Sequence, residues 1–360
     1  MNWNIFKKFI GIGAINIIVI ILFLLLLEIT FRLIFPEFKN DIHSDKITSG
    51  KFKRYSNFFG YEIRSLKQEQ NINIKKNKKI VIVLGDSISD GFGHAYYDIW
   101  WNQLERLLKI KNKEYKFISI SGFGNNFADN IFNGMNLISK LKNNGLKPYK
   151  IIYQFNFNDI QPSKREDLNK KNYSANKFNF SKWRYEYLNQ SVFARVIQHY
   201  GGIIRRNTSG SCEERDLDAL GPYTWTFGSK NKSAEAQEYW RIFAKNIKQF
   251  EEFLTNNNIN FEIVLSPILY EIDQSNIHPY YNYLNFNFEC ATIDPYKKLE
   301  DISITNKIKI YDPTNYLRLM FANRIADNNF EPFYFNADDN HITPLASRHL
   351  AEFIAKEWIE

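Results

Sequence analysis

The sequence predicts a three-layer α/β/α sandwich with a mainly parallel, five-stranded sheet. Short apolar segments alternate with stretches of helical periodicity from residue 78 to residue 360. These segments lack the polar alternation of a sheet with one face in solvent, which is typical of parallel strands covered by helices on both faces. Such alternation favours a layered domain with right-handed crossovers. The predicted strands are Ile80–Leu84, Tyr115–Ile120, Lys150–Phe155, Phe261–Leu265 and Lys307–Tyr311.

Three predicted helices present an apolar face to this sheet. The second begins after Ser233 and is long. The third has Thr343 as its N-cap and Pro344 at its first position, a combination that favours a helix start. The inward-facing residues are Trp100, Leu104, Leu107 and Leu108 in the first helix, Trp240, Phe243, Ile247, Phe250 and Leu254 in the second, and Leu350, Ile354 and Trp358 in the third.

Residues 1–36 are predicted to form an N-terminal tail and a transmembrane anchor. The run Phe9–Leu27 is nineteen residues long and contains Asn16 as its only polar side chain. As a helix it would span roughly 28 Å, which is enough for the hydrocarbon core of a bilayer. No small-x-small cleavage site follows it, so an uncleaved anchor is favoured over a signal peptide. Glu28 and Arg32, four residues apart, are spaced to pair at its end.

The orientation of this anchor is predicted from the sizes of the segments on its two sides. Basic residues flank both ends of the run, so the count of positive charges does not decide the orientation. A very short tail before the run and a large domain behind it favour export of the domain. We therefore expect a single-pass membrane protein whose main domain is periplasmic or extracellular.

Composition places the rest of the chain among globular proteins. The 360 residues are 44% hydrophobic and 16% aromatic, which excludes general disorder. A net charge of +8 suits an anionic membrane or a polyanionic glycan, although an ordinary solvated surface is the simpler explanation. The sequence has no zinc-type Cys/His spacing, P-loop or GxGxxG, so no metal, organic cofactor or nucleic-acid partner is expected. Whether Cys212 and Cys290 form a disulfide is left open.

The chain behind the anchor divides into a lead-in and one domain. Residues 37–77 are polar and rich in Lys and Asn, which indicates a stalk or an irregular lead-in. The α/β domain occupies residues 78–360. Within it, residues 161–232 show no clear strand and are too long for an ordinary loop, so a helical, aromatic-rich insertion is expected. Its clusters Phe178–Leu188 and Tyr223–Gly228 would pack a small subdomain or stack on sugar rings.

A serine follows the first predicted strand, in "KKIVIVLGDSISDGFG". In open parallel sheets ligands bind beyond the carboxyl ends of the strands, so Ser87 would be displayed there after a tight exit at Gly85. A serine needs an adjacent base to act as a nucleophile. The candidate base is His341, in "NADDNHITP", with Asp338 placed to hold the imidazole and Asp339 as its competitor.

Acyl transfer also needs donors for the oxyanion that develops on the substrate, each worth about 3 kcal/mol. The second strand leads into "SISGFG", where the N–H of Gly122 would approach a substrate. The third leads into "YQFNFND", where the side-chain amide of Asn158 would do the same. Both segments end at the same edge of the predicted sheet as Ser87.

These segments, "GDSISDG", Gly122, "FNFND" and "DDNH", resemble in order and strand context the four blocks of the SGNH hydrolases, also called GDSL-like esterases. The resemblance runs from the first strand to the C-terminus, apart from the insertion. It implies a flavodoxin-like sandwich, with Ser87 as nucleophile and His341 as base, held by Asp338. It also implies an oxyanion hole made by the Ser87 N–H, the Gly122 N–H and the Asn158 amide. Membrane-anchored members with such insertions resemble enzymes that act on acyl groups of exported glycans.

The chain departs from that family in its third block. Asn156 stands where the family has glycine, and a side chain there would narrow the oxyanion site or change the backbone. In the second block, Gly124 is an alternative to Gly122. Two other polar residues, Asp86 and Asp159, are expected to be hydrogen-bonding scaffolds rather than catalysts.

Two other histidines are expected to have no catalytic role. His94 lies near the serine in the sequence but precedes a helix, where a solvated loop residue is expected. His349 lies on the last predicted helix and is expected to be structural.

We therefore expect a serine ester hydrolase that removes acetyl or other short acyl groups from an exported cell-envelope carbohydrate. An O-acyltransferase that passes the acyl group to a sugar hydroxyl would share the same acyl-enzyme and stays an alternative. A catalytically inactive glycan-binding or assembly protein on the same fold is a third possibility, suggested by Asn156. The expected partners are an acylated carbohydrate or small ester, and a membrane reached through the N-terminal helix.

Overall fold

The structure is a computed structural model, and it describes most of the α/β domain together with the N-terminal helix. The described residues are 3–34, 55–58, 61–64, 79–91, 93–121, 126–157, 159–160, 191, 193, 196, 224–228, 233–272, 291–327, 331, 333–336 and 339–359. Cys212 and Cys290 lie outside these ranges, as does most of the predicted insertion at 161–232.

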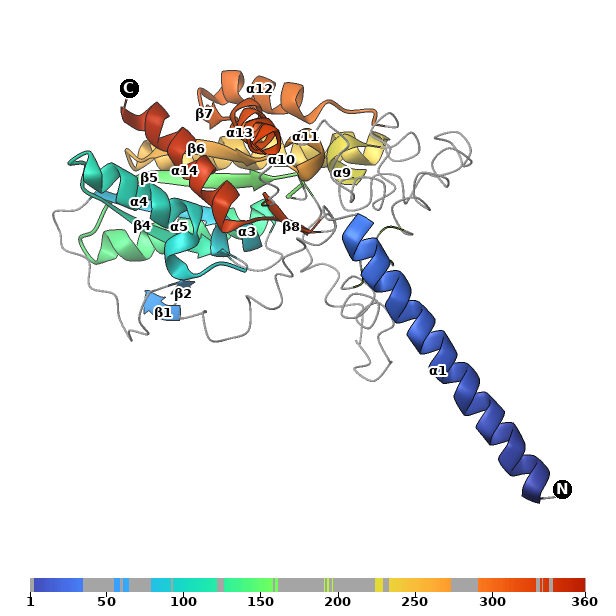
Figure 1. Cartoon of the computed structure of the whole chain (residues 1–360). Helices are drawn as coiled ribbons and strands as arrows, with labels where there is room; N and C mark the ends of the chain where they lie inside the picture. The colour runs from blue at the N-terminus through green and yellow to red at the C-terminus, as the bar shows by residue number, and fades with distance from the viewer. Residues whose placement is uncertain are drawn as a thin grey trace.

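Five parallel strands form the central sheet, in the order β4-β3-β5-β6-β7 (Figure 1). This is the strand order of a flavodoxin-like sheet. All five predicted strands are confirmed. The last is shorter than predicted because Lys307 ends the preceding helix in the left-handed region, with φ 55°. The strands are β3 (Lys79–Gly85), β4 (Tyr115–Ser121), β5 (Pro148–Asn156), β6 (Asn260–Ser266) and β7 (Lys309–Tyr311).

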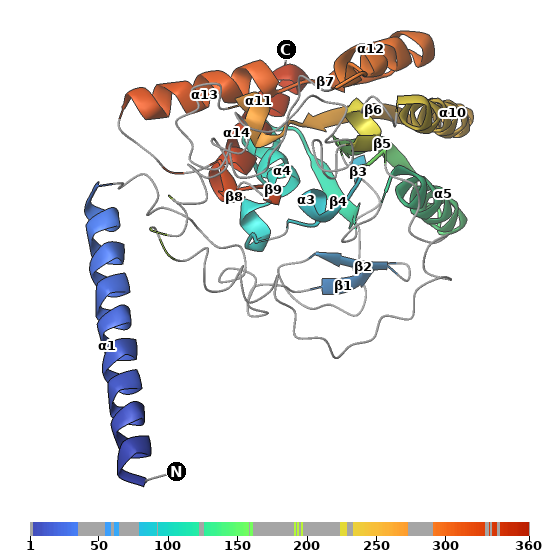
Figure 2. The same cartoon turned by 90° about the vertical axis from the view of Figure 1, so that its right-hand side faces the viewer.

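Helices cover both faces of the sheet, so the predicted three layers are confirmed (Figures 1 and 2). On strand β3, Ile80, Ile82 and Leu84 point into one hydrophobic core and Val81 and Val83 into the other. Helices α5 (Phe127–Asn143), α10 (Ser233–Asn256) and α12 (Pro295–Asn306) close the first core, and α4 (Trp100–Ile110), α13 (Thr314–Ala326) and α14 (Pro344–Ile359) close the second.

The predicted helix faces agree with the observed burial. All five residues predicted to face inward on α10 are buried. On α4 and α14 the predicted face is also buried, except that Leu107 and Trp358 stay partly exposed while packing against the second core. Thr343 precedes α14 and its hydroxyl accepts from Ala346 N at 3.4 Å, as expected of an N-cap.

Two antiparallel hairpins were not predicted. Strands β1 (Tyr55–Phe58) and β2 (Tyr61–Arg64) pair within the predicted stalk or lead-in, so this part of it has regular structure. Strands β8 (Tyr334–Asn336) and β9 (Asp339–Ile342) pair just before α14. Each strand has only three or four residues and polar composition, so no periodicity marks it in the sequence.

The N-terminal helix α1 (Trp3–Ile34) extends away from the domain (Figure 1). Most of its described apolar side chains between Ile18 and Ile34 are exposed. At its domain end, Glu28 accepts hydrogen bonds from Ser191 Oγ at 2.6 Å and from Phe193 N at 3.1 Å. These contacts fix that end of the helix to the domain.

The predicted membrane anchor is not confirmed. Across the part of the chain that the structure describes, no helix combines the length and the apolar character that a bilayer crossing demands. The predicted run Phe9–Leu27 lies partly outside that part, because the side chains of residues 9–15 and 17 are not described.

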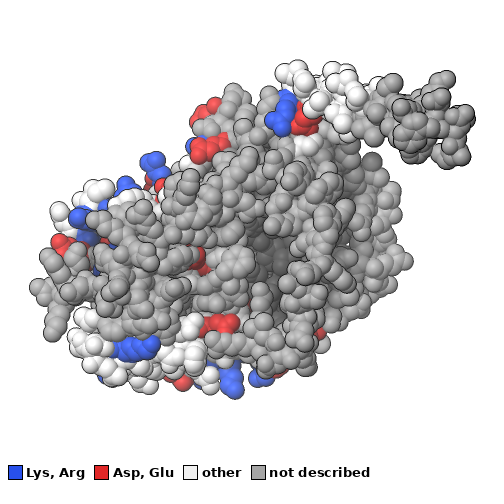
Figure 3. Space-filling view, turned by 90° about the horizontal axis from the view of Figure 1, so that it is seen from below, with Lys and Arg blue, Asp and Glu red and all other residues white. Residues whose placement is uncertain are grey.

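Charged residues are mixed in sign on the described surface. Figure 3 shows blue and red side chains interspersed over the described parts of one face, without a large area of a single sign there. The excess of basic residues therefore fits an ordinary solvated surface on this face.

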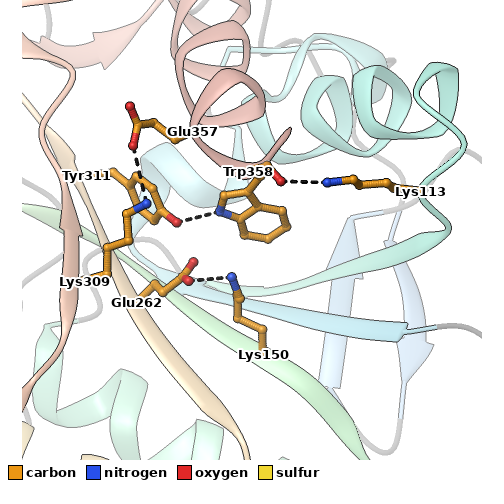
Figure 4. Close-up of polar contacts among 7 residues, drawn as sticks. All are labelled: Lys113, Lys150, Glu262, Lys309, Tyr311, Glu357 and Trp358. Carbon is orange, nitrogen blue, oxygen red and sulfur yellow. Dashed lines mark hydrogen bonds and ion pairs between the residues drawn. The ribbon is translucent and has the colours of Figure 1, made fainter. Parts of the chain in front are cut away.

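An ion pair is buried where strands β5 and β6 begin (Figure 4). Lys150 Nζ lies 2.5 Å from Glu262 Oε1, and both side chains are about nine-tenths buried, at 10% and 12% exposure. The same ammonium lies 4.0 Å from the centre of the Trp358 ring, and the indole N–H donates to Tyr311 Oη at 2.8 Å. Burial lowers the pKa of Lys150, and the Glu262 carboxylate opposes this effect. The Glu262 carboxylate thus helps the buried Lys150 ammonium to stay charged.

Removing one partner of this ion pair should lower the free energy of unfolding more than replacing both partners by apolar residues. We expect Glu262→Ala to lower the free energy of unfolding by about 3–5 kcal/mol, because it leaves the Lys150 ammonium buried without its carboxylate. The double variant Lys150→Met/Glu262→Met should be close to wild type or more stable, since no charge remains to be desolvated. Urea unfolding measures both, and equal losses in the single and double variants would contradict this account.

Candidate active site

Three local features shape the turn that carries Ser87. Strand β3 ends at Gly85, and a Cβ at that position would lie 2.3 Å from Ser89 Oγ, so only glycine fits the exit. Asp86 then caps the short helix α3 (Ser87–Asp90) by accepting from Ile88 N at 2.9 Å. Gly91 ends it in the left-handed region, with φ 74°. Ser87 is therefore held at the carboxyl end of a central strand, as predicted.

The structure brings Ser87 and His341 together. His341 Nε2 lies 2.6 Å from Ser87 Oγ, although the two residues are 254 positions apart in the sequence. The histidine is presented by β9 of the unpredicted hairpin. A hydroxyl and an imidazole nitrogen at this distance have the geometry of a nucleophile and its general base.

The other predicted site residues lie outside the described parts of the chain. These are Asp338, Gly122 with its alternative Gly124, and Asn158. Asp339 belongs to strand β9, but its side chain is not described. The acid that orients the histidine and the oxyanion donors therefore stay predictions.

A buried glutamine on the neighbouring strand supports the serine turn. The Oε1 atom of Gln154, on β5, accepts from Ser89 Oγ and from the indole N–H of Trp100, the latter at 2.8 Å. The indole of Trp101 donates to the carbonyl of Ser89 at 2.8 Å. Sequence reasoning placed Trp100 in the core but missed this polar role. A polar residue inside the otherwise apolar third strand was the signal that could have revealed it.

Asn156 points toward the serine turn. Its Nδ2 lies 3.4 Å from Asp86 Oδ2, and its backbone N–H donates to Asp159 Oδ2 at 2.8 Å. All three residues are buried, with exposures of 2% for Asn156 and 3% for each aspartate. Asp86 and Asp159 thus accept hydrogen bonds as scaffolds, as predicted. Burial first, and the charge of Asp86 second, raise the pKa of Asp159 well above its usual range.

The described part of the insertion also supports this edge of the sheet. In helix α9 (Thr224–Phe227), Thr226 Oγ1 donates to the carbonyl of Phe157, the residue that follows β5. The Phe227 ring packs 5.4 Å from the Phe157 ring, and Trp240 Nε1 donates to the Thr226 carbonyl at 2.8 Å. Because Thr226 and Phe227 are buried, this portion of the Tyr223–Gly228 cluster packs in the core and is not a sugar platform.

Comparisons with known proteins give only distant similarities. No family model and no curated protein matches the chain. Among solved structures, the acetyl xylan esterase AlAXEase shares 13% identity at a TM-score of 0.38, over 77% of this chain and 98% of the esterase. A lipase/acylhydrolase from Enterococcus faecalis shares 9% sequence identity at a TM-score of 0.37, over 78% of this chain and 94% of the acylhydrolase. The lipase Lip_vut3 from a goat rumen metagenome shares 13% sequence identity at a TM-score of 0.39, over 78% of this chain and 97% of the lipase. Similarity this weak does not place the chain in a family.

Two substitutions of Asn156 should separate its polarity from its size. We expect Asn156→Gly to lower the free energy of unfolding by about 1–2 kcal/mol, because one long hydrogen bond and some packing are lost. Asn156→Asp keeps the shape but adds a carboxylate beside Asp86 and Asp159, and should cost about 3 kcal/mol or more at neutral pH.

The pH dependence of the Asn156→Asp variant gives the check. Burial among carboxylates raises the folded-state pKa of the new carboxyl above its unfolded value of about 3.9. Its cost should then be absent near pH 4 and grow as the pH rises toward the folded-state pKa. Thermal unfolding of this variant and wild type at several pH values measures the difference. A difference that is constant with pH would show that folding does not raise the pKa of the new carboxyl, and would contradict this account.

Proposed function

We propose that the chain is a serine ester hydrolase. The observation that carries the proposal is the 2.6 Å contact between Ser87 Oγ and His341 Nε2 at the carboxyl end of strand β3. A serine in contact with a base, on a rigid turn at the ligand-binding edge of a parallel sheet, is the arrangement that acyl transfer requires. This contact favours an enzyme over an inactive binding protein on the same fold.

In the proposed reaction, Ser87 Oγ attacks the ester carbonyl while His341 Nε2 takes the hydroxyl proton. The tetrahedral intermediate then breaks the bond to the alcohol oxygen, which receives that proton from the imidazolium. The acyl group stays on Ser87 until water attacks it, with His341 taking the proton of the water. The acyl–Oγ bond then breaks, the carboxylic acid leaves, and the imidazolium returns the proton to Ser87 Oγ. Asp338 is proposed to hold the imidazole in the tautomer that presents Nε2 to the serine.

The oxyanion is proposed to be stabilised by donors at the same edge. The N–H of Ser87, the N–H of Gly122 and the amide of Asn158 would surround the carbonyl oxygen, each contributing about 3 kcal/mol to transition-state stabilisation. Asn156 does not compete for this space in our proposal, since its amide faces Asp86.

The proposed substrate is an acetyl or other short acyl ester on an exported cell-envelope carbohydrate. This part rests on the sequence. The four blocks resemble the SGNH hydrolases, whose membrane-anchored members with insertions resemble enzymes that act on acyl groups of exported glycans, and the run Phe9–Leu27 is apolar enough to attach the chain to a membrane. Lipid would then cover the exposed apolar side chains of α1, and the Glu28–Arg32 ion pair at 2.7 Å would mark its end. The domain would be periplasmic or extracellular.

Ser87→Ala should abolish ester hydrolysis. We expect the turnover of an aryl acetate by the full-length protein in detergent to fall by about 10⁴-fold or more, because the nucleophile is removed. A fluorophosphonate probe, which bonds to an activated serine oxygen with loss of fluoride, should label wild type and not this variant. Ser139→Ala is the matched control, since Ser139 lies exposed on α5 and its hydroxyl donates to the carbonyl of Met135.

Equal turnover or equal labelling of wild type and Ser87→Ala would refute the hydrolase proposal. Product analysis with a glycan acceptor present separates hydrolysis from transfer, because hydrolysis releases free acid and transfer yields an acylated sugar.

Membrane attachment has its own test. The full-length protein should sediment with membranes and resist extraction by alkaline carbonate. The double variant Ile18→Lys/Val19→Lys should be released, because each lysine at the centre of a spanning helix costs about 2.5–3.5 kcal/mol. Ile110→Lys, which changes an exposed residue of the domain at 75% exposure, should have no effect. A wild-type protein found in the soluble fraction would contradict the attachment.

A further inference from the structure

His94 contacts the backbone next to the proposed base, His341. It follows the serine turn in the chain and was expected to be a solvated loop residue, but only 3% of it is exposed, so that expectation is wrong. Its Nε2 atom lies 2.7 Å from the carbonyl oxygen of Ile342, the residue next to His341. The ring thus connects the segment that carries the serine to the strand that carries the base.

The protonation of this ring follows from its partners. A carbonyl oxygen can only accept a hydrogen bond, so Nε2 of His94 must carry a proton and donate it. On the other side of the ring, Nδ1 lies 3.4 Å from Ser347 Oγ on α14. The backbone of His94 is itself fixed, since its N–H donates to the carbonyl of Gly91 at 3.0 Å. The ring therefore joins a fixed turn to β9 through a short, directed bond.

Two other hydrogen bonds reach the backbone that follows β9, but neither connects it to the serine turn as closely as His94 does. Gln103 Nε2 lies 3.4 Å from the carbonyl of Pro344, at the limit of a hydrogen bond. Thr343 N donates to the carbonyl of Phe333 at 2.8 Å, but Phe333 belongs to the same C-terminal hairpin segment. The His94 bond is the shortest of the three, and it reaches the backbone beside His341 directly.

We propose that His94 is a positioning residue that sets the backbone of β9 so that His341 Nε2 faces Ser87 Oγ. The inference rests on the proposed hydrolase function. His94 does not touch the reacting atoms, and its effect passes through the Ile342 carbonyl. Displacement of a catalytic group by about 1 Å can cost about 10²-fold in rate. Loss of this bond should therefore lower kcat and leave KM nearly unchanged, because no substrate contact is removed.

Two substitutions of His94 test the hydrogen bond. His94→Phe keeps a ring of similar size without a donor, and we expect kcat for an aryl acetate to fall by about 10- to 100-fold at nearly constant KM. His94→Gln places an amide N–H close to the position of Nε2 and should recover most of the lost kcat. His349→Gln is the control, since that histidine pairs with Glu352 on its own helix, and should change kcat by less than about twofold.

A second measurement does not depend on turnover. The histidine ring signals of the full-length protein, followed by NMR through a pH titration, should show a changed His341 signal in His94→Phe and a nearly native one in His94→Gln. Thermal unfolding of the same samples separates this local effect from loss of folding. If His94→Phe fails to fold, His94→Asn replaces it, because its shorter amide does not reach the Ile342 carbonyl and should lower kcat where His94→Gln does not.

The outcomes separate this inference from the proposed function. If wild type hydrolyses the ester and His94→Phe keeps its kcat, the inference is overturned and the hydrolase stands. If His94→Gln is folded but as impaired as His94→Phe, the hydrogen bond is not the cause and the inference is also overturned. If wild type neither hydrolyses nor labels, the hydrolase fails, and an unchanged His341 signal in His94→Phe would then refute the positioning role by itself.

Discussion

The parallel sheet imposes the constraint on which the rest of the structure depends, because all of its strands end at the same edge. Ser87 follows the end of β3, and β5, which pairs with β3, ends at Asn156 beside the same turn. The 2.6 Å contact with His341 adds a third element, the β8–β9 hairpin, at this edge. A serine and a histidine meet there because the β8–β9 hairpin brings the C-terminal segment to the end of β3.

Strand β5 shows how one sheet supports two different polar environments. Its middle residues, Ile151 to Tyr153, are completely buried in the two apolar cores. Toward its start, Lys150 keeps a charge by pairing with Glu262, whereas toward its end Gln154 and Asn156 are neutral amides. The two amides hold the serine turn from the neighbouring strand, while the Asp86 carboxylate caps the turn from within it.

The sequence predicted the parts of the fold that repeat a pattern. Apolar runs marked all five strands of the main sheet, and helical spacing marked the faces of α4, α10 and α14. The motif blocks also predicted that Ser87 and His341 would meet. The hairpins were missed because strands of three or four residues are too short for a period to be visible.

Buried polar contacts were the other part that sequence reasoning missed. His94 and Gln154 look like ordinary polar residues until their partners are known, and the partner of His94 lies 248 positions away. Hydrogen bonds of this kind depend on tertiary structure, so local propensity carries no information about them. Asn156 was different, because its departure from a motif could be seen, although the direction of its side chain could not.

The long span between the serine and its histidine has a consequence for biosynthesis. A ribosome must add 254 more residues after Ser87 before the imidazole exists, and closing so long a loop costs entropy that is recovered only when the last segment docks. A nascent polypeptide therefore displays its hydroxyl without the partner that would activate it. The proposed chemistry therefore cannot begin until synthesis of the chain has passed residue 341.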